Sequence, residues 1–228
     1  MLCEGYLVAK RGEAIMRWRG ALAAAALGVA GLLGSGCVFV FDHGPRVTYG
    51  DTLLVPPYQG GGLQVVAAAQ DRREYVLSGQ TEPEYVGQAR SRWGIPHHRH
   101  TESGQPLAAD LGRAAAEALR RAGFEVARVE LAPKDPEVIA LTRLRQPGGA
   151  RILYLLIHEW MYDRYRGYTN LLTYKLEARV LDSAGQRLAS VVREDERQIE
   201  RAAVLEYAAV LADLLTDPAL VSALEAQP

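Results

Sequence analysis

Residues 152–160 read ILYLLIHEW, and this stretch decides the fold. In an extended chain the side chains alternate between two faces, and here both faces are apolar as far as Ile157. A strand of this kind is buried on both sides, which is typical of the central strand in a sheet covered by helices. The stretch therefore predicts a layered protein of helices and strands with 152–160 in the middle of its sheet.

In the segments around this strand, apolar residues recur either at helical spacing or at the alternating spacing of a strand. Residues 106–122 place Leu107, Leu111 and Leu119 on one helical stripe, which Gly123 ends. Residues 172–180 alternate apolar with polar or charged residues, as expected of a strand with one solvated face. The expected strands are 63–69, 124–131, 152–160, 172–180 and 188–197, and the expected helices are 106–122, 136–145, 202–215 and 218–224.

These segments predict an α/β (α+β) fold in the order β-α-β-α-β-β-β-α, with helices packed on a mixed β-sheet of about five strands. The β-α-β-α-β part requires parallel strands, and the turn at 183–186 adds an antiparallel hairpin. Residues 82–105 show no clear period and contain several Gly and Pro residues. We expect them to form a long loop that is either functional or mobile.

The composition excludes several classes of protein. The chain has 228 residues, of which 49% are hydrophobic and 23% charged, and this balance excludes wholesale disorder. Its net charge of −1 lacks the basic excess of a nucleic-acid-binding protein. Its two cysteines are too few for a disulfide scaffold or a four-cysteine zinc site.

The N-terminal region has the layout of an export signal. Arg17 and Arg19 precede 22 residues, 20–41, that carry no charge. Met16 is a candidate for the true start, because it would open a compact basic segment. The sequence LGSGC at 33–37 resembles a bacterial lipobox, with Leu33 four residues before the cysteine. This resemblance implies that Cys37 is acylated and becomes the mature N-terminus.

The expected organisation is a signal peptide at 1–36, a lipidated tether rich in Gly and Pro at 37–62, and a periplasmic domain at 63–228. The expected membrane contact is through acyl chains on Cys37. Val38 implies sorting to the outer membrane, on its periplasmic face. Two alternatives stay open: the small residues before Cys37 also suit ordinary signal cleavage, and the uncharged stretch could be an uncleaved anchor.

The domain is similar to the YajG-like group of small bacterial lipoproteins, and to the N-terminal domains of TolB and of curli-secretion lipoproteins. The similarity rests on four short segments of the sequence. They are Asp71-Arg72-Arg73 after the first strand, the helix followed by Gly123-Phe124-Glu125-Val126, the segment 174–182 with Gly185, and the closing Ala-rich helix. The resemblance implies a non-enzymatic envelope protein without catalytic residues or cofactors.

Two groups of residues are candidates for an interaction surface. Arginine and tryptophan in a loop suit anions and partner proteins, and tyrosines are enriched at interfaces. The loop candidates are Arg90, Arg92, Trp93, His97, His98 and His100, and the interface candidates are Tyr162, Tyr165 and Tyr168. His158 and Glu159 are expected on opposite faces of the central strand.

These observations predict a lipid-anchored, non-enzymatic envelope lipoprotein that acts as a binding or assembly component for a protein partner. One alternative is an auxiliary subunit of an envelope transport or secretion complex. Another is a metal-binding protein or an enzyme that uses the histidines of 97–100, with Glu102 or the pair at 158–159 as a further ligand.

Overall fold

The computed structural model describes residues 60–91, 93–164, 170–199 and 203–226. The chain divides into two units, Met1–Phe39 and Val40–Pro228, and the fold below belongs to the second. The expected signal peptide, Cys37 and almost all of the expected tether lie outside the described residues, as do Arg92, Tyr165 and Tyr168.

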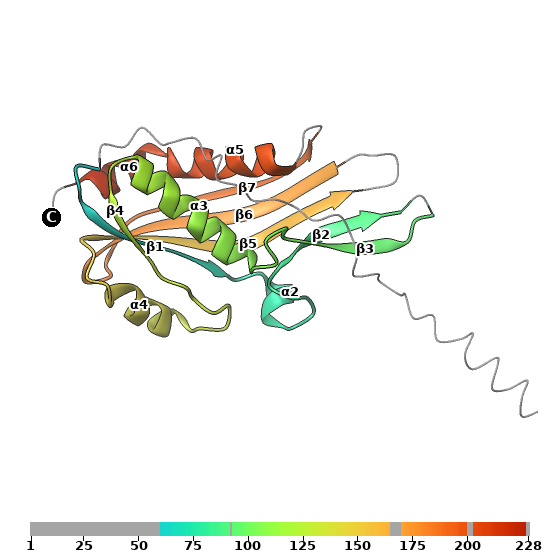
Figure 1. Cartoon of the computed structure of the whole chain (residues 1–228), viewed down its shortest axis with the longest axis horizontal. Coiled ribbons are helices and arrows are strands. Elements are labelled where there is room, and N and C mark those ends of the chain that lie inside the picture. Colours follow the sequence, from blue (N-terminus) through green and yellow to red (C-terminus); the bar gives the residue numbers. More distant parts are fainter. Residues whose placement is uncertain (1–59, 92, 165–169, 200–202, 227–228) are drawn as a thin grey trace, which may run out of the picture. The chain divides into compact units, whose positions relative to one another are not determined.

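The described residues form the predicted mixed α+β fold, built on one seven-stranded sheet (Figure 1). Its core order is β4-β1-β5-β6-β7, and a hairpin of β2 and β3 joins further along β5. The strands are β1 (Gln64–Asp71), β2 (Tyr85–Arg90), β3 (Pro96–His100), β4 (Glu125–Arg128), β5 (Arg151–Arg164), β6 (Asn170–Asp182) and β7 (Arg187–Ile199). The helices are α2 (Glu74–Leu77), α3 (Leu107–Arg121), α4 (Glu137–Arg145), α5 (Ala203–Leu215) and α6 (Pro218–Glu225).

The predicted pairings are confirmed in direction. Strand β1 runs parallel to both β4 and β5, and β6 is antiparallel to its two neighbours, β5 and β7. Helices α3, α5 and α6 cover one face of the sheet and share a large hydrophobic cluster with it (Figure 1). Helix α4 covers part of the other face over a smaller cluster that includes Ile152, Tyr154 and Leu156. Strand β5 is thus buried on both faces over its first half, as its sequence predicts.

Local signals explain where α3 and α6 begin and end. Helix α3 buries its stripe of Leu107, Leu111 and Leu119 against β1 and β4. It ends in a Schellman motif, in which Gly123 adopts φ +86° and the amide of Phe124 donates to the carbonyl of Leu119 at 3.1 Å. At the start of α6, Asp217 accepts a hydrogen bond from the amide of Ala219 at 2.9 Å.

The expectation of a long loop at 82–105 is wrong, because most of that segment is the antiparallel hairpin of β2 and β3. The strand count therefore rises from about five to seven. Neither strand shows an apolar alternation, because the hairpin packs through aromatic, histidine and arginine side chains. Its turn is marked by Gly94, which adopts φ +80°.

The expectation that His158 and Glu159 lie on opposite faces is also wrong. The pairing of β5 with β6 shifts between Ile157 and Glu159, so His158 is an inserted residue in a β-bulge. The ring of His158 reaches Glu177, while Glu159 pairs with Lys175 on the same face. The bulge thus places both side chains on the face opposite the large cluster.

Among the described helices, none alone has the length and apolar character to span a bilayer, although the bent pair Tyr207–Leu215 and Pro218–Glu225 meets both criteria together.

Candidate functional site

The hairpin of β2 and β3 is the candidate site, because it carries the described residues of the predicted interaction loop. In Figure 1 it extends away from the helices, beyond the end of α3 at which Leu107 lies. Strand β2 contacts β5 through the pairing of Ala89 with Arg164. The amide of Gln88 also donates to Asp163 at 2.7 Å. The hairpin is therefore built onto the second half of β5.

A buried ion pair joins the base of the hairpin to the core. Asp71 ends β1, and its carboxylate binds Arg73 at 2.6 Å with both side chains fully buried. Arg73 also donates to the carbonyl of Pro83 at 3.0 Å, just before β2, and to the carbonyl of Tyr85 at 2.5 Å, at the start of β2. Burial opposes the charge on Arg73, but the hydrogen bond and charge of Asp71 outweigh it and raise the pKa of Arg73. The guanidinium thus stays charged and ties β1 to the hairpin.

Backbone packing fixes the hairpin against β5. Gly87 adopts φ +146°, and a Cβ atom there would overlap the backbone of Tyr162. The ring of Tyr162 is 5% exposed and lies 3.9 Å from the guanidinium carbon of Arg99 in β3. Tyr162 therefore packs inside the hairpin base and does not form part of an exposed interface.

The histidines of β3 separate onto two faces. His98 and His100 lie together, with ring centroids 6.2 Å apart, and both contact the ring of Tyr85. His97 and Arg99 alternate with them, so they point to the other face. Within the described residues, no group of three or more His, Cys, Asp or Glu side chains is placed to hold a metal ion. Of the predicted metal ligands among 97–100, His97 and His100 thus lie on different faces, whereas His98 and His100 lie on the same face.

Hydrogen bonds to Ser91 connect the described residues of the turn at the hairpin tip. The hydroxyl of Ser91 accepts hydrogen bonds from the amides of Trp93 at 3.3 Å and Ile95 at 3.1 Å. The amide of Gly94 donates to the carbonyl of Ser91 at 2.9 Å. Trp93 projects from this turn with 82% of its surface exposed, and Ile95 is 39% exposed. The predicted loop residue Trp93 is thus exposed at the tip, in a turn whose described residues are hydrogen-bonded to Ser91.

A polar cluster lies beside the bulge, on the face of the sheet that α4 covers in part. Glu177 accepts hydrogen bonds from Arg179 at 2.5 Å and Ser190 at 2.9 Å, and His158 lies 3.2 Å from it. Burial alone would raise the pKa of Glu177, but these hydrogen bonds outweigh it and lower the pKa to about 2. Arg179 also pairs with Glu137 of α4 at 2.8 Å. The cluster joins α4 to β6 and engages His158, which the sequence placed among possible metal ligands.

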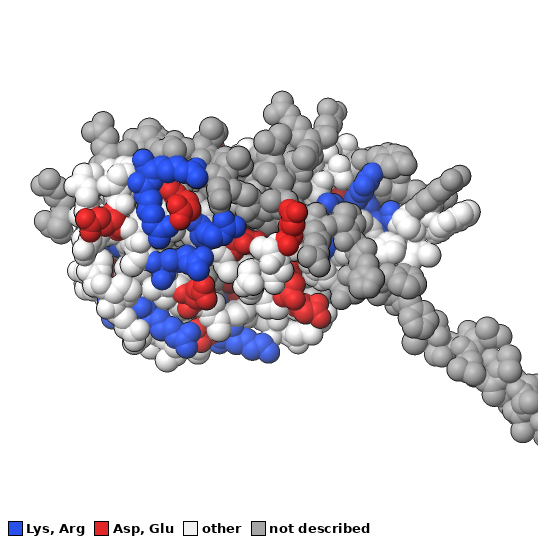
Figure 2. Space-filling view, viewed as in Figure 1, with Lys and Arg blue, Asp and Glu red and all other residues white. Residues whose placement is uncertain are grey.

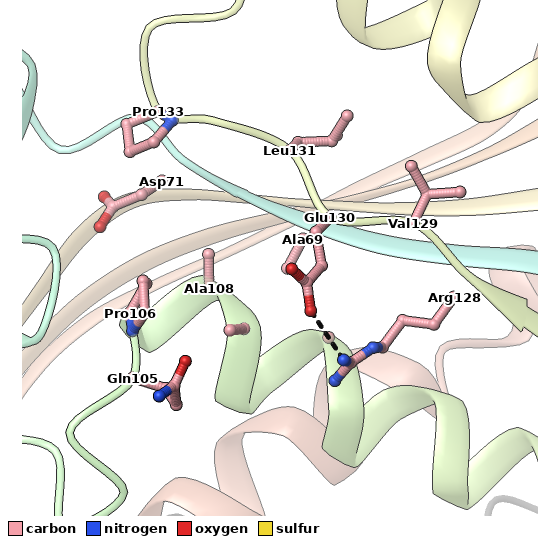
Figure 3. Close-up of a pocket in the computed structure, with 12 residues that line it drawn as sticks. Ala69, Asp71, Gln105, Pro106, Ala108, Arg128, Val129, Glu130, Leu131 and Pro133 are labelled. Atoms are coloured by element: carbon pink, nitrogen blue, oxygen red, sulfur yellow. Dashed lines mark hydrogen bonds and ion pairs between the residues drawn. The ribbon is translucent and has the colours of Figure 1, made fainter.

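A small cavity of about 160 Å³ lies where β1 ends, beside the first turn of α3 (Figure 3). Arg128 and Glu130 pair at 2.7 Å beside it, and Asp71 is engaged by Arg73. Its volume is below that of most sites for small-molecule ligands, which begin at about 300 Å³. Figure 2 shows positive and negative side chains interleaved over the described part of one face, without a single-signed area.

Sequence reasoning missed three parts of this site: the Asp71–Arg73 ion pair, Gly87 and Ile95. The charged Asp71, two residues after the apolar strand at 63–69, was a signal for a buried ion pair. Gly94 between Trp93 and Ile95 was a signal for a turn. The close approach at Gly87 had no signal that could be separated from a loop glycine.

The sequence matches no protein-family model and no curated protein. Solved structures resemble it at low similarity. One is a protein of family DUF330 from Xanthomonas campestris, with TM-score 0.44, 16% identity, and coverage of 79% of this chain and 93% of the other. Another is the PelC dodecamer from Paraburkholderia phytofirmans, with TM-score 0.42, 15% identity, and coverage of 75% and 91%.

A third is the lipoprotein GNA1162 from Neisseria meningitidis, with TM-score 0.31, 15% identity, and coverage of 68% of this chain and 99% of the other. The structures that resemble this chain thus include a bacterial lipoprotein. Likeness at these scores concerns general architecture, and it does not assign the chain to any of the three groups. The resemblance to the YajG-like group stays a prediction.

Proposed function

We propose that this chain is a lipid-anchored, non-enzymatic protein of the bacterial envelope that acts as a binding or assembly component. The observation that carries the binding role is the hairpin tip, where Trp93 is 82% exposed on a turn held by Ser91. A large aromatic side chain held in this way offers contact area at a low entropic cost, as interface anchors do.

The location is proposed from the N-terminal sequence. The uncharged stretch 20–41 and the LGSGC sequence at 33–37 support acylation of Cys37. Residues 37–228 carry 22 basic and 25 acidic side chains, so the processed chain has a net charge of −3. In this proposal the acyl chains hold the protein on the periplasmic face of the outer membrane, and the hairpin contacts a second component of the envelope.

Acylation is tested by metabolic labelling with a palmitate analogue and by membrane fractionation. Cys37→Ala should lose the label and leave the membrane fraction. Cys3→Ala is the matched control, because it removes the only other cysteine and should change neither result. Label and membrane attachment that persist in Cys37→Ala would refute the anchor.

The binding role is tested by crosslinking in intact envelopes. Trp93→Ala should remove the crosslinked species formed by the wild-type protein. Val138→Ala, which trims a side chain 74% exposed on α4, is the control and should leave the pattern unchanged. The same pattern for Trp93→Ala and the wild type would refute the hairpin as the contact surface.

A further inference from the structure

The chemistry of the hairpin tip restricts what it can contact. Trp93 is the most exposed large hydrophobic side chain in the described part of the chain, and Ile95 lies beside it in the same turn. Tryptophan combines a large apolar ring with one N–H donor, and it is enriched where hydrocarbon meets water in membranes. The tip therefore offers one interfacial side chain and one aliphatic side chain next to each other in the sequence of the turn.

The charge of the hairpin favours an anionic surface. Residues 85–101 contain three Arg but no Asp or Glu, and of these Arg99 is buried over Tyr162 at the hairpin base. Arg90 is exposed at the end of β2, just before the turn. An arginine beside an interfacial tryptophan can bind phosphate groups through its guanidinium while its alkyl part covers apolar surface.

The hairpin is also held in place at its base, as expected of an element that inserts into a membrane. Its base is fixed by the Asp71–Arg73 pair and by the close contact of Gly87 with Tyr162, and the amides of Trp93 and Ile95 in its turn donate to the hydroxyl of Ser91. Little conformational entropy of the hairpin base would be lost when the tip enters a membrane interface, and this lowers the entropic cost of binding.

The expected acyl anchor leaves enough chain for this contact. Gly60 donates a hydrogen bond to the carbonyl of Ala122 at 2.9 Å, at the far end of the domain from the hairpin tip (Figure 1). The 22 residues between Cys37 and Gly60 can span up to about 75 Å when extended. The 14 residues of β5 are about 46 Å long. A chain anchored at Cys37 can therefore place its hairpin tip on the same membrane.

We propose that the β2–β3 hairpin is a membrane-insertion element, in which Trp93 and Ile95 enter the headgroup region of a bilayer and Arg90 binds anionic phosphate groups. The hairpin then gives the lipoprotein a second membrane contact and orients the sheet against the leaflet. This deepens the proposed function and rests on it, because the anchor at Cys37 keeps the domain near the membrane.

Tryptophan fluorescence in brominated vesicles tests the proposal. The chain has three tryptophans, Trp18, Trp93 and Trp160, and Trp160 is only 1% exposed. The protein is purified from membranes in a Trp18→Phe background and reconstituted into phosphatidylcholine–phosphatidylglycerol vesicles, with or without bromine on the acyl chains. We expect bromine-dependent quenching of Trp93 and none of the buried Trp160. Trp93→Phe should abolish the quenching completely.

Two variants sharpen the test. Val138→Trp in the Trp93→Phe background moves the exposed tryptophan to α4, and quenching should not return. Arg90→Ala should lower the inserted population roughly fivefold in anionic vesicles, as expected for one basic residue at such a surface. Equal quenching of the wild type in vesicles of phosphatidylcholine alone would overturn the role of Arg90 and of the positive charge.

Palmitate labelling of the same preparation separates the two proposals. Label on Cys37 without quenching of Trp93 would overturn the insertion proposal alone, and it would leave a protein partner as the occupant of the hairpin tip. Quenching without label would refute the acyl anchor and support insertion.

Discussion

The two halves of β5 lie in different environments. Arg151–Ile157 runs between β1 and β6, is buried on both faces and contributes to both hydrophobic clusters. Beyond the bulge at His158, alternate residues are half-exposed, and the strand contacts β2 instead of β1. One strand thus belongs to a closed core at one end and supports a projecting hairpin at the other. Stability is expected to depend on the first half and on the buried Trp160 of the second, and contact with partners on the hairpin that the second half supports.

The largest expected effect concerns the ion pair that joins these two regions. Asp71→Ala leaves the fully buried Arg73 without its counter-charge, so we expect the free energy of unfolding to fall by about 3–5 kcal/mol. Chemical denaturation of the purified protein measures this change. Asp71→Leu combined with Arg73→Met removes both charges and should recover most of the loss. A loss below about 1 kcal/mol for the single variant would show that the pair behaves like an exposed one.

The second effect concerns the close contact between hairpin and core. Gly87→Ala would combine a backbone at φ +146° with an overlap against Tyr162, so we expect a loss of about 2–4 kcal/mol. Gly94→Ala is the matched control in the same hairpin, since φ is +80° there and nothing lies within 4 Å of an added Cβ. It should cost only about 1 kcal/mol. Equal losses in thermal or chemical denaturation would contradict the packing at Gly87.

The third effect is a pH dependence at the polar cluster beside the bulge. The pKa of Glu177 is lowered to about 2 in the folded protein, so its ionised form stabilises the fold above its unfolded value near 4.5. This contribution, roughly 2–3 kcal/mol, should be lost as the pH falls from about 4.5 to 2. Glu177→Gln should flatten that part of the stability profile. A variant with the wild-type acid profile would rule out Glu177 as the group responsible.

The smallest expected effect distinguishes the two tryptophans of the domain. Trp93→Ala removes an exposed side chain and should change the free energy of unfolding by less than about 0.5 kcal/mol. Trp160→Ala empties a site that is 1% exposed and should cost about 3–5 kcal/mol. Differential scanning calorimetry compares the two variants. Similar losses would mean that Trp93 has a structural role in the fold.

The same contrast explains what the sequence could predict. The segment at 152–157 carries apolar side chains on both faces, so its central position followed directly from its pattern. The apolar stripe of α3 and its end at Gly123 could be predicted in the same way, because burial of one helical face imposes a spacing of three to four residues between apolar side chains.

The hairpin was not predicted as a hairpin, because its packing does not depend on aliphatic side chains. Arg99 lies over Tyr162, and His98 lies against Tyr85, so polar residues occupy positions that a hydrophobic period would mark. The bulge at His158 was likewise not predictable, since it depends on the register with β6. Trp93 stays a predicted site residue, and its exposure follows only from the turn.

Photocrosslinking in intact cells tests the central claim most directly, namely that the hairpin tip is the membrane-contacting surface of an envelope-anchored domain. A photoreactive amino acid is placed at position 93 and, as control, at position 138, where Val138 is also highly exposed. The account predicts phospholipid adducts from position 93, identified by mass spectrometry, and none from position 138. No phospholipid adduct from position 93, or equal adducts from both positions, would contradict it.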